Sequence, residues 1–118
     1  MNKDINTISI LGTDYTISYV SQSEIDKMMN SSEFTGVCNE HTKEIFISTL
    51  DDHLTDMQRD LVMSLNLRHE IIHAFLNESG LSWDALGCNN WPKNEEMIGW
   101  LSIQLPKIFE VYKKLDIL

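Results

Sequence analysis

Basic residues, long apolar runs and signal-like segments are scarce in this sequence. Nine lysines and arginines stand against eighteen aspartates and glutamates, and the formal net charge is −9. This balance argues against a nucleic-acid backbone as the main partner, because phosphate binding needs clustered basic side chains. No stretch approaches the ~20 apolar residues of a membrane helix. The start, MNKDINTISI, lacks the features of a secretory signal. We therefore expect a soluble, cytoplasmic protein.

Cysteine is also rare. Cys38 and Cys88 are too few for a disulfide scaffold, and we expect both to be free thiols, as in a reducing cytosol. Repeats, low-complexity segments and linkers are absent. The 118 residues suit one compact domain over 1–118.

Alternating patterns in the first half predict two β-hairpins. The first covers residues 7–20 and is joined by Gly12-Thr13-Asp14, and the second covers residues 35–48 and turns at residues 40–43. A short helix with a capping box is predicted between them, over residues 21–29. The two hairpins predict a small antiparallel sheet.

In the second half the apolar pattern changes to the helical period. Thr55 and Gln58 have capping-box spacing, and the helix that they begin is expected to end at Gly80. A last helix is expected from an Asn94 cap to the end of the chain, and Pro106 should kink or split it. The sequence thus predicts an α+β fold, in which the sheet packs on a long helix and a long kinked C-terminal helix.

The long helix contains the sequence His-Glu-Ile-Ile-His at residues 69–73. His69 and His73 stand about one turn apart on one face, so both imidazoles can reach one tetrahedral Zn²⁺ at roughly 2.0–2.1 Å. Glu70 is rotated by about 100° from His69. It can therefore flank the metal as a general base without occupying a ligand position.

The alternative is an ordinary helix that contains two histidines by chance. Placement favours the metal, because His69 and His73 continue the inward line of Val62 and Leu65. Two buried histidines without a partner would be costly, and a metal ion is the simplest partner.

The third ligand of the expected zinc is not a histidine, because none follows His73. A metzincin site would need glycine at position 76 and histidine at position 79, where this chain has Leu76 and Ser79. The metzincin class is therefore excluded. The other downstream donors are Glu78, Asp84, Cys88, Glu95, Glu96, Glu110 and Asp116. Glu78 is expected to point away from the metal, and acidic residues at 95 and 96 also suit the first turn of any helix.

The segment LRHEIIHAFLNESG, followed by NEEMIGWLS, resembles the small phage and prophage zinc-metallopeptidase-like proteins and, more distantly, the ImmA/IrrE peptidases. The preceding GVCNEHTKEIFIS fits the same pattern, and the resemblance covers roughly residues 34–105. It implies a minimal zincin-like domain of the gluzincin type. It also implies that the third ligand is Glu95, after Asn94, with Glu96 as second choice.

One position departs from this family. Related peptidases often carry an acidic or amide residue four positions after the ligand glutamate, where it supports a ligand histidine; this chain has Gly99. Losing such a support typically weakens metal affinity or activity ~10–100-fold. Asp84 or Asn90 are the candidate substitutes.

The expected function is zinc-dependent hydrolysis of a peptide or protein, with Glu70 as the base. An additional donor should stabilise the oxyanion, and the candidates are His41, His53, Tyr15 and Tyr112. The competing hypothesis is a non-catalytic zinc-binding phage module that binds a host protein. An intact Glu70 favours the enzyme, whereas the small size and Gly99 favour the module.

Overall fold

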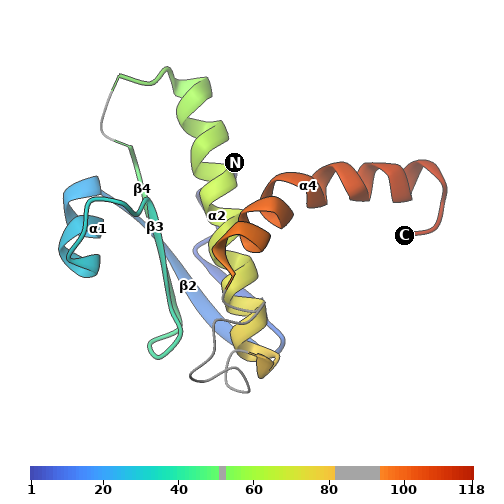
Figure 1. Cartoon of the computed structure of the whole chain (residues 1–118), viewed down its shortest axis with the longest axis horizontal. Coiled ribbons are helices and arrows are strands. Elements are labelled where there is room, and N and C mark those ends of the chain that lie inside the picture. Colours follow the sequence, from blue (N-terminus) through green and yellow to red (C-terminus); the bar gives the residue numbers. More distant parts are fainter. Residues whose placement is uncertain (51–52, 82–93) are drawn as a thin grey trace.

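The computed structural model describes residues 1–50, 53–81 and 94–118 (Figure 1). The described chain forms a sheet and helices, which confirms the expected α+β class. Its elements are β1 (Thr7–Ile10), β2 (Thr13–Val20), α1 (Gln22–Met29), β3 (Gly36–Asn39), β4 (Glu44–Ser48), α2 (Asp56–Glu78) and α4 (Glu95–Lys114).

The sheet is mixed, with the strand order β1-β2-β4-β3. Each hairpin is antiparallel as expected, but the central strands β2 and β4 run parallel, with Ile17 opposite Ile45. The prediction of an antiparallel sheet is therefore wrong at this pair. Alternation shows which side chains share a face of a strand, but it does not show which strands become neighbours. Here α1 and β3 lie between β2 and β4 in the chain, so β4 can return in the direction of β2.

The turn of the first hairpin is shorter than the sequence predicted. Thr13 and Asp14 belong to β2. The turn consists of Leu11 and Gly12, whose φ angles are 51° and 89°. A two-residue turn with two positive φ angles matches the right-handed twist of the paired strands.

The helix α2 covers one face of the sheet, and α1 lies on the opposite side of β3 and β4 (Figure 1). Met63 of α2 is fully buried, whereas Val62 is 36% exposed. The inward line predicted through Val62 is therefore wrong, because each step along a helix rotates the side chain by about 100°. The central core cluster contains Ile10, Tyr15, Ile17, Ile45, Ile47, Leu50, Met63 and Ala74.

The helix ends follow their sequence signals. Both predicted capping boxes are present: Ser21 pairs with Glu24 at the start of α1, and Thr55 pairs with Gln58 at the start of α2. Gly80 follows α2 with a φ of 87°. This is the left-handed conformation that favours glycine after a helix.

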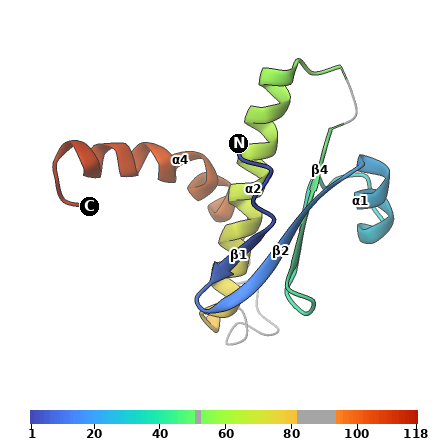
Figure 2. The same cartoon turned by 180° about the vertical axis from the view of Figure 1, so that it is seen from behind.

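The helix α4 begins beside α2 and then extends away from the sheet (Figures 1 and 2). It continues through Pro106, so the proline does not split it. A proline removes the N–H that would bond the carbonyl four residues earlier, here that of Ser102. Arg68 of α2 donates from Nε to this carbonyl oxygen at 2.7 Å. No helix in the described ranges has the length and apolarity needed to cross a membrane.

Candidate metal centre

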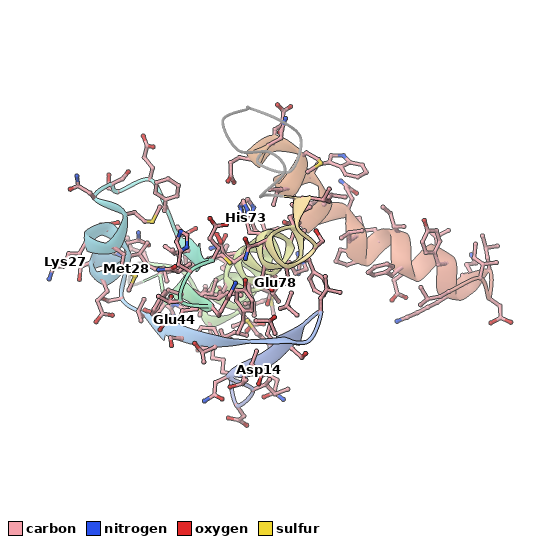
Figure 3. All side chains as sticks on the ribbon, turned by 90° about the horizontal axis from the view of Figure 1, so that it is seen from below. Asp14, Lys27, Met28, Glu44, His73 and Glu78 are labelled. Atoms are coloured by element: carbon pink, nitrogen blue, oxygen red, sulfur yellow. The ribbon has the colours of Figure 1, made fainter. Side chains whose placement is uncertain are left out.

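Two helices bring together the side chains of the candidate metal centre. His69, Glu70 and His73 lie in the second half of α2, and Glu95 is the first residue of α4. The Asn94 side chain accepts a hydrogen bond from the Met97 backbone N–H at 2.9 Å and so fixes the start of α4. A carboxylate in this first turn is stabilised by the helix dipole. In Figure 3, His73 lies on the side of α2 turned away from β2.

The donor atoms of the two histidines and Glu95 converge. His69 Nε2 lies 2.8 Å from Glu95 Oε2, and His73 Nε2 lies 3.1 Å from Glu95 Oε1. The two Nε2 atoms are 3.2 Å apart. Ligand atoms at about 2.0–2.1 Å from a tetrahedral ion are about 3.3 Å from one another, so these separations fit a single small cation after slight expansion.

The protonation of His73 also suits a metal ligand. Burial lowers the pKa of His73, although the nearby Glu95 carboxylate acts in the opposite direction. A histidine binds metal in its neutral form. The side chains of His69 and His73 are 26% and 25% exposed. They are therefore less buried than the sequence predicted, and both imidazoles are accessible from solvent.

Glu70 lies next to the two histidines but is more deeply buried. It is 7% exposed, and its carboxylate belongs with the imidazoles of His69 and His73 to a cluster whose ligand atoms all lie within 4.8 Å of one another. This cluster could hold a metal ion. Burial, and then the charge of Glu95, raises the pKa of Glu70 to about 8. A nearby cation would favour its ionised form.

Gly36 of β3 leaves the space that Glu70 occupies. A Cβ atom at this position would lie 3.1 Å from Glu70 Cγ and 3.3 Å from Ile47 Cδ1. Both distances are shorter than ordinary van der Waals contacts between carbon atoms. The glycine therefore permits β3 to pass close to the Glu70 side chain and fixes one wall of the site.

Two clefts share His69, and His73 lines the first of them. The first has a volume of about 320 Å³ and is also lined by Met29, Phe34, Val37 and Glu40. The second has a volume of about 270 Å³ and is also lined by Glu33, Thr35 and Asn66. His69, Glu70 and Glu95 line both clefts. The side chains of the candidate metal centre are therefore accessible from these clefts.

Among the other candidate third ligands, Glu78 points elsewhere as expected. It accepts hydrogen bonds from Lys43 Nζ and from the Tyr15 hydroxyl, both at 2.7 Å. The bond from Lys43 in particular lowers the pKa of Glu78 to about 2. Glu96 is exposed at the start of α4, and Glu110 bonds Lys113 on the part of α4 beyond Pro106. Asp116 lies after α4, and Asp84 and Cys88 lie outside the described residues.

Gly99 is the position where the resemblance suggested a supporting residue. A Cβ atom there would meet no atom of the described residues within 4 Å. Asn90, like Asp84, lies outside the described residues. Cys38 is a free cysteine, as expected.

The four predicted oxyanion donors do not line either cleft beside the histidines. Tyr15 is fully buried, and its hydroxyl is bonded to Glu78 and Asn77. His41 and His53 are exposed, and Tyr112 lies on the part of α4 beyond Pro106. Asn66, which was not among the predicted donors, lines the second cleft. Its position four residues before Glu70 places both side chains on one face of α2.

Comparison of the chain with protein-family models, with curated proteins and with solved structures finds no match. The resemblance to zinc-metallopeptidase-like proteins stays an expectation based on residues 34–105. The geometry of His69, Glu70, His73 and Glu95 supplies the physical basis for a functional proposal.

Proposed function

We propose that the protein is a zinc-dependent peptidase with a minimal zincin-like domain. In this proposal His69, His73 and Glu95 hold the ion, and Glu70 is the general base. One observation carries the proposal: two imidazole nitrogens and the Glu95 carboxylate converge, and the buried Glu70 carboxylate lies within 4.8 Å of the same imidazoles. Three protein ligands suffice for a catalytic zinc, so Glu70 can act as the base. Two histidines and one glutamate form a ligand set known for catalytic zinc.

Bound zinc would lower the pKa of a water molecule and polarise a substrate carbonyl. The residues of the chain have separate tasks around it. Glu70 takes the proton of the attacking water on its carboxylate and can then pass it to the leaving amine. Burial raises the pKa of Glu70 in the metal-free chain, and a bound cation would act in the opposite direction, so zinc would favour the carboxylate form that a base requires.

The surroundings of the site support an extended polypeptide as substrate. Two clefts of about 320 Å³ and 270 Å³ leave room beside His69, Glu70 and Glu95. Within the described sheet, β3 is an edge strand, and it contacts α2. An edge strand offers backbone N–H and C=O groups that can pair with an extended peptide. The peptide would then cross the metal centre in a defined direction.

The first test is the metal content of the purified protein. We expect one zinc per chain by elemental analysis, with loss of zinc in His73→Ala. The same ligand types can also hold iron, so iron in place of zinc would contradict the proposal. So would a protein that takes up neither metal on reconstitution.

The second test is Glu70→Gln, assayed for cleavage of a fluorogenic peptide library. The variant should keep zinc and fold, because Glu70 is not a ligand, and should lose activity by about 10²–10⁴-fold. Glu96→Gln is the matched control, because Glu96 is exposed on α4. Equal activity of both variants would refute the peptidase.

The competing function is a zinc-binding module that acts through contact with another protein. In that case zinc binding persists, but no peptide is cleaved and Glu70→Gln has no effect. The burial of Glu70 favours the enzyme. A purely structural metal site gains nothing from a carboxyl group that is desolvated beside its ligands.

A further inference from the structure

Asn66 carries a polar atom that the described fold leaves without a partner. Its side-chain Nδ2 is buried and forms no hydrogen bond with any described residue. A buried amide N–H without a partner destabilises the fold relative to a paired one. Stability alone therefore does not account for an asparagine at this position of α2.

The position of Asn66 relates this amide to the metal centre. Residues three and four apart on a helix are neighbours on its surface. Asn66 lies three residues before His69 and four before Glu70, and it lines the cleft of about 270 Å³ together with both of them and Glu95. Two other buried atoms lack partners among the described residues, Tyr19 Oη and Asn77 Oδ1, but neither residue lines this cleft.

We propose that the Asn66 side-chain amide donates a hydrogen bond to the carbonyl oxygen of the bound peptide. This inference rests on the proposed peptidase function and assigns the missing oxyanion donor. The terminal torsion of asparagine is broad, so the amide can turn its Nδ2 toward a ligand in the cleft. The bond strengthens when water adds to the carbonyl and its oxygen becomes negative.

An amide suits this task at this place. Glu70 and Glu95 both line the same cleft, and a cationic donor would pair with one of them. Asparagine donates a hydrogen bond without carrying charge, so it leaves Glu70 free to take a proton and Glu95 free to bind metal. Removing one side-chain donor of this kind typically costs about 10²–10³-fold in the rate constant.

The test uses zinc-loaded protein and two small probes, measured by isothermal titration calorimetry. Acetohydroxamate binds a metal through oxygen atoms, one of which is a carbonyl oxygen that would accept the hydrogen bond proposed for Asn66. Imidazole binds the metal but offers no such oxygen. Asn66→Ala should lower the affinity for acetohydroxamate by about 10-fold, equivalent to one ordinary hydrogen bond. The affinity of the same variant for imidazole should stay within about twofold of the wild-type value. Asn66→Leu, which keeps the bulk, should behave in the same way.

Asn77→Ala is the matched control, because it is the same change on the same helix. The Asn77 amide donates from Nδ2 to the Tyr15 hydroxyl at 3.0 Å. This variant should lower the melting temperature and leave acetohydroxamate affinity unchanged. Asn66→Ala should do the reverse, with a melting temperature of the metal-free protein that is equal to or above that of the wild type, since it removes an unpaired polar group.

Equal acetohydroxamate affinity for wild type and Asn66→Ala would overturn the assignment, and so would an equal loss for both probes. A wild-type protein that takes up zinc but does not bind acetohydroxamate overturns the Asn66 proposal alone. A protein that binds zinc, shows the Asn66 effect and cleaves no peptide overturns the peptidase alone. Failure to take up zinc overturns both.

Discussion

Arg68 donates a hydrogen bond from Nε to the carbonyl oxygen of Ser102, which Pro106 deprives of its usual helix partner. The bond joins α2 to α4 directly beside His69. Ser102 is 1% exposed, so its carbonyl group has little access to water. The carbonyl group that Pro106 leaves free in α4 thus accepts a hydrogen bond from Arg68 in α2, and this bond attaches the helix that carries Glu95 to the helix that carries the histidines.

We predict that Arg68→Met lowers the free energy of unfolding by about 1–3 kcal/mol, because it leaves a buried carbonyl without a donor. In a Pro106→Ala background the same change should cost less than half as much, since the restored N–H at position 106 can bond the Ser102 carbonyl. Urea unfolding of the four proteins gives the coupling energy. Equal costs in the two backgrounds would show that Arg68 and Pro106 act independently.

The two glutamates at the start of α4 should differ in metal binding. Both side chains are exposed, but Glu95 contacts both histidines and lines both clefts, whereas Glu96 lines neither. Glu95→Ala should lower the affinity for zinc by about 100-fold or more. This loss exceeds the usual effect of removing a residue that only hydrogen-bonds to a metal ligand. Glu96→Ala should stay within about threefold, the same order as a change in local helix electrostatics. Competition with a chromophoric chelator measures both affinities. A larger loss for Glu96→Ala would exchange the roles of the two residues.

Gly36→Ala should displace the Glu70 side chain, the proposed base, without preventing metal binding. The new methyl group would lie 3.1 Å from Glu70 Cγ, so Glu70 or β3 must move. We expect peptide cleavage to fall by about 10-fold or more, because small displacements of catalytic groups have large effects. Zinc affinity should change little.

Gly99→Ala is the control for Gly36→Ala, because a Cβ atom at position 99 meets nothing within 4 Å in the part of the chain that the structure describes. It should leave cleavage unchanged and raise stability slightly, since alanine favours a helix over glycine. Full activity of Gly36→Ala, with unchanged stability, would mean that Glu70 is not fixed by this strand.

The buried Glu70 should make the metal-free protein sensitive to pH. Its folded-state pKa is raised from the ordinary 4.5 to about 8 by burial. Between these values the folded chain keeps a proton that the unfolded chain has lost, so stability falls as the pH rises. Glu70→Gln escapes this fall and should be more stable than the wild type at pH 8, by on the order of 3 kcal/mol.

Urea unfolding in a chelator at pH 4.5 and pH 8 measures this difference. The difference in free energy of unfolding between wild type and Glu70→Gln should be small at pH 4.5. At pH 8 this difference should decrease when zinc is added. The ion favours the Glu70 carboxylate through its charge. A gap that does not depend on pH would exclude ionisation of Glu70 as its cause.

The sequence predicted the local features well because these depend on neighbouring residues. The Thr55–Gln58 capping box, the left-handed Gly80 and the Asn94 cap are each encoded within a few positions. The His69–His73 spacing is also local. All of them could be read without knowledge of the tertiary structure.

Features that depend on distant contacts could not be predicted. The parallel pairing of Ile17 with Ile45 joins segments separated by a helix and a strand. The role of Gly36 depends on the approach of β3 to Glu70, which no local pattern encodes. Asn66 was accessible from helical spacing, but its missing hydrogen bond appears only in the folded chain.

The attachment of α4 has a consequence for hydrogen exchange. This helix makes its main contact with α2 rather than with the sheet, and weakly attached elements open more often than the core. An ion held by His69, His73 and Glu95 would tie the two helices together, and binding slows opening in proportion to ligand saturation. Amide protection along α4, compared with that of β2 and β4, would therefore report how much of the protein carries metal inside a living cell.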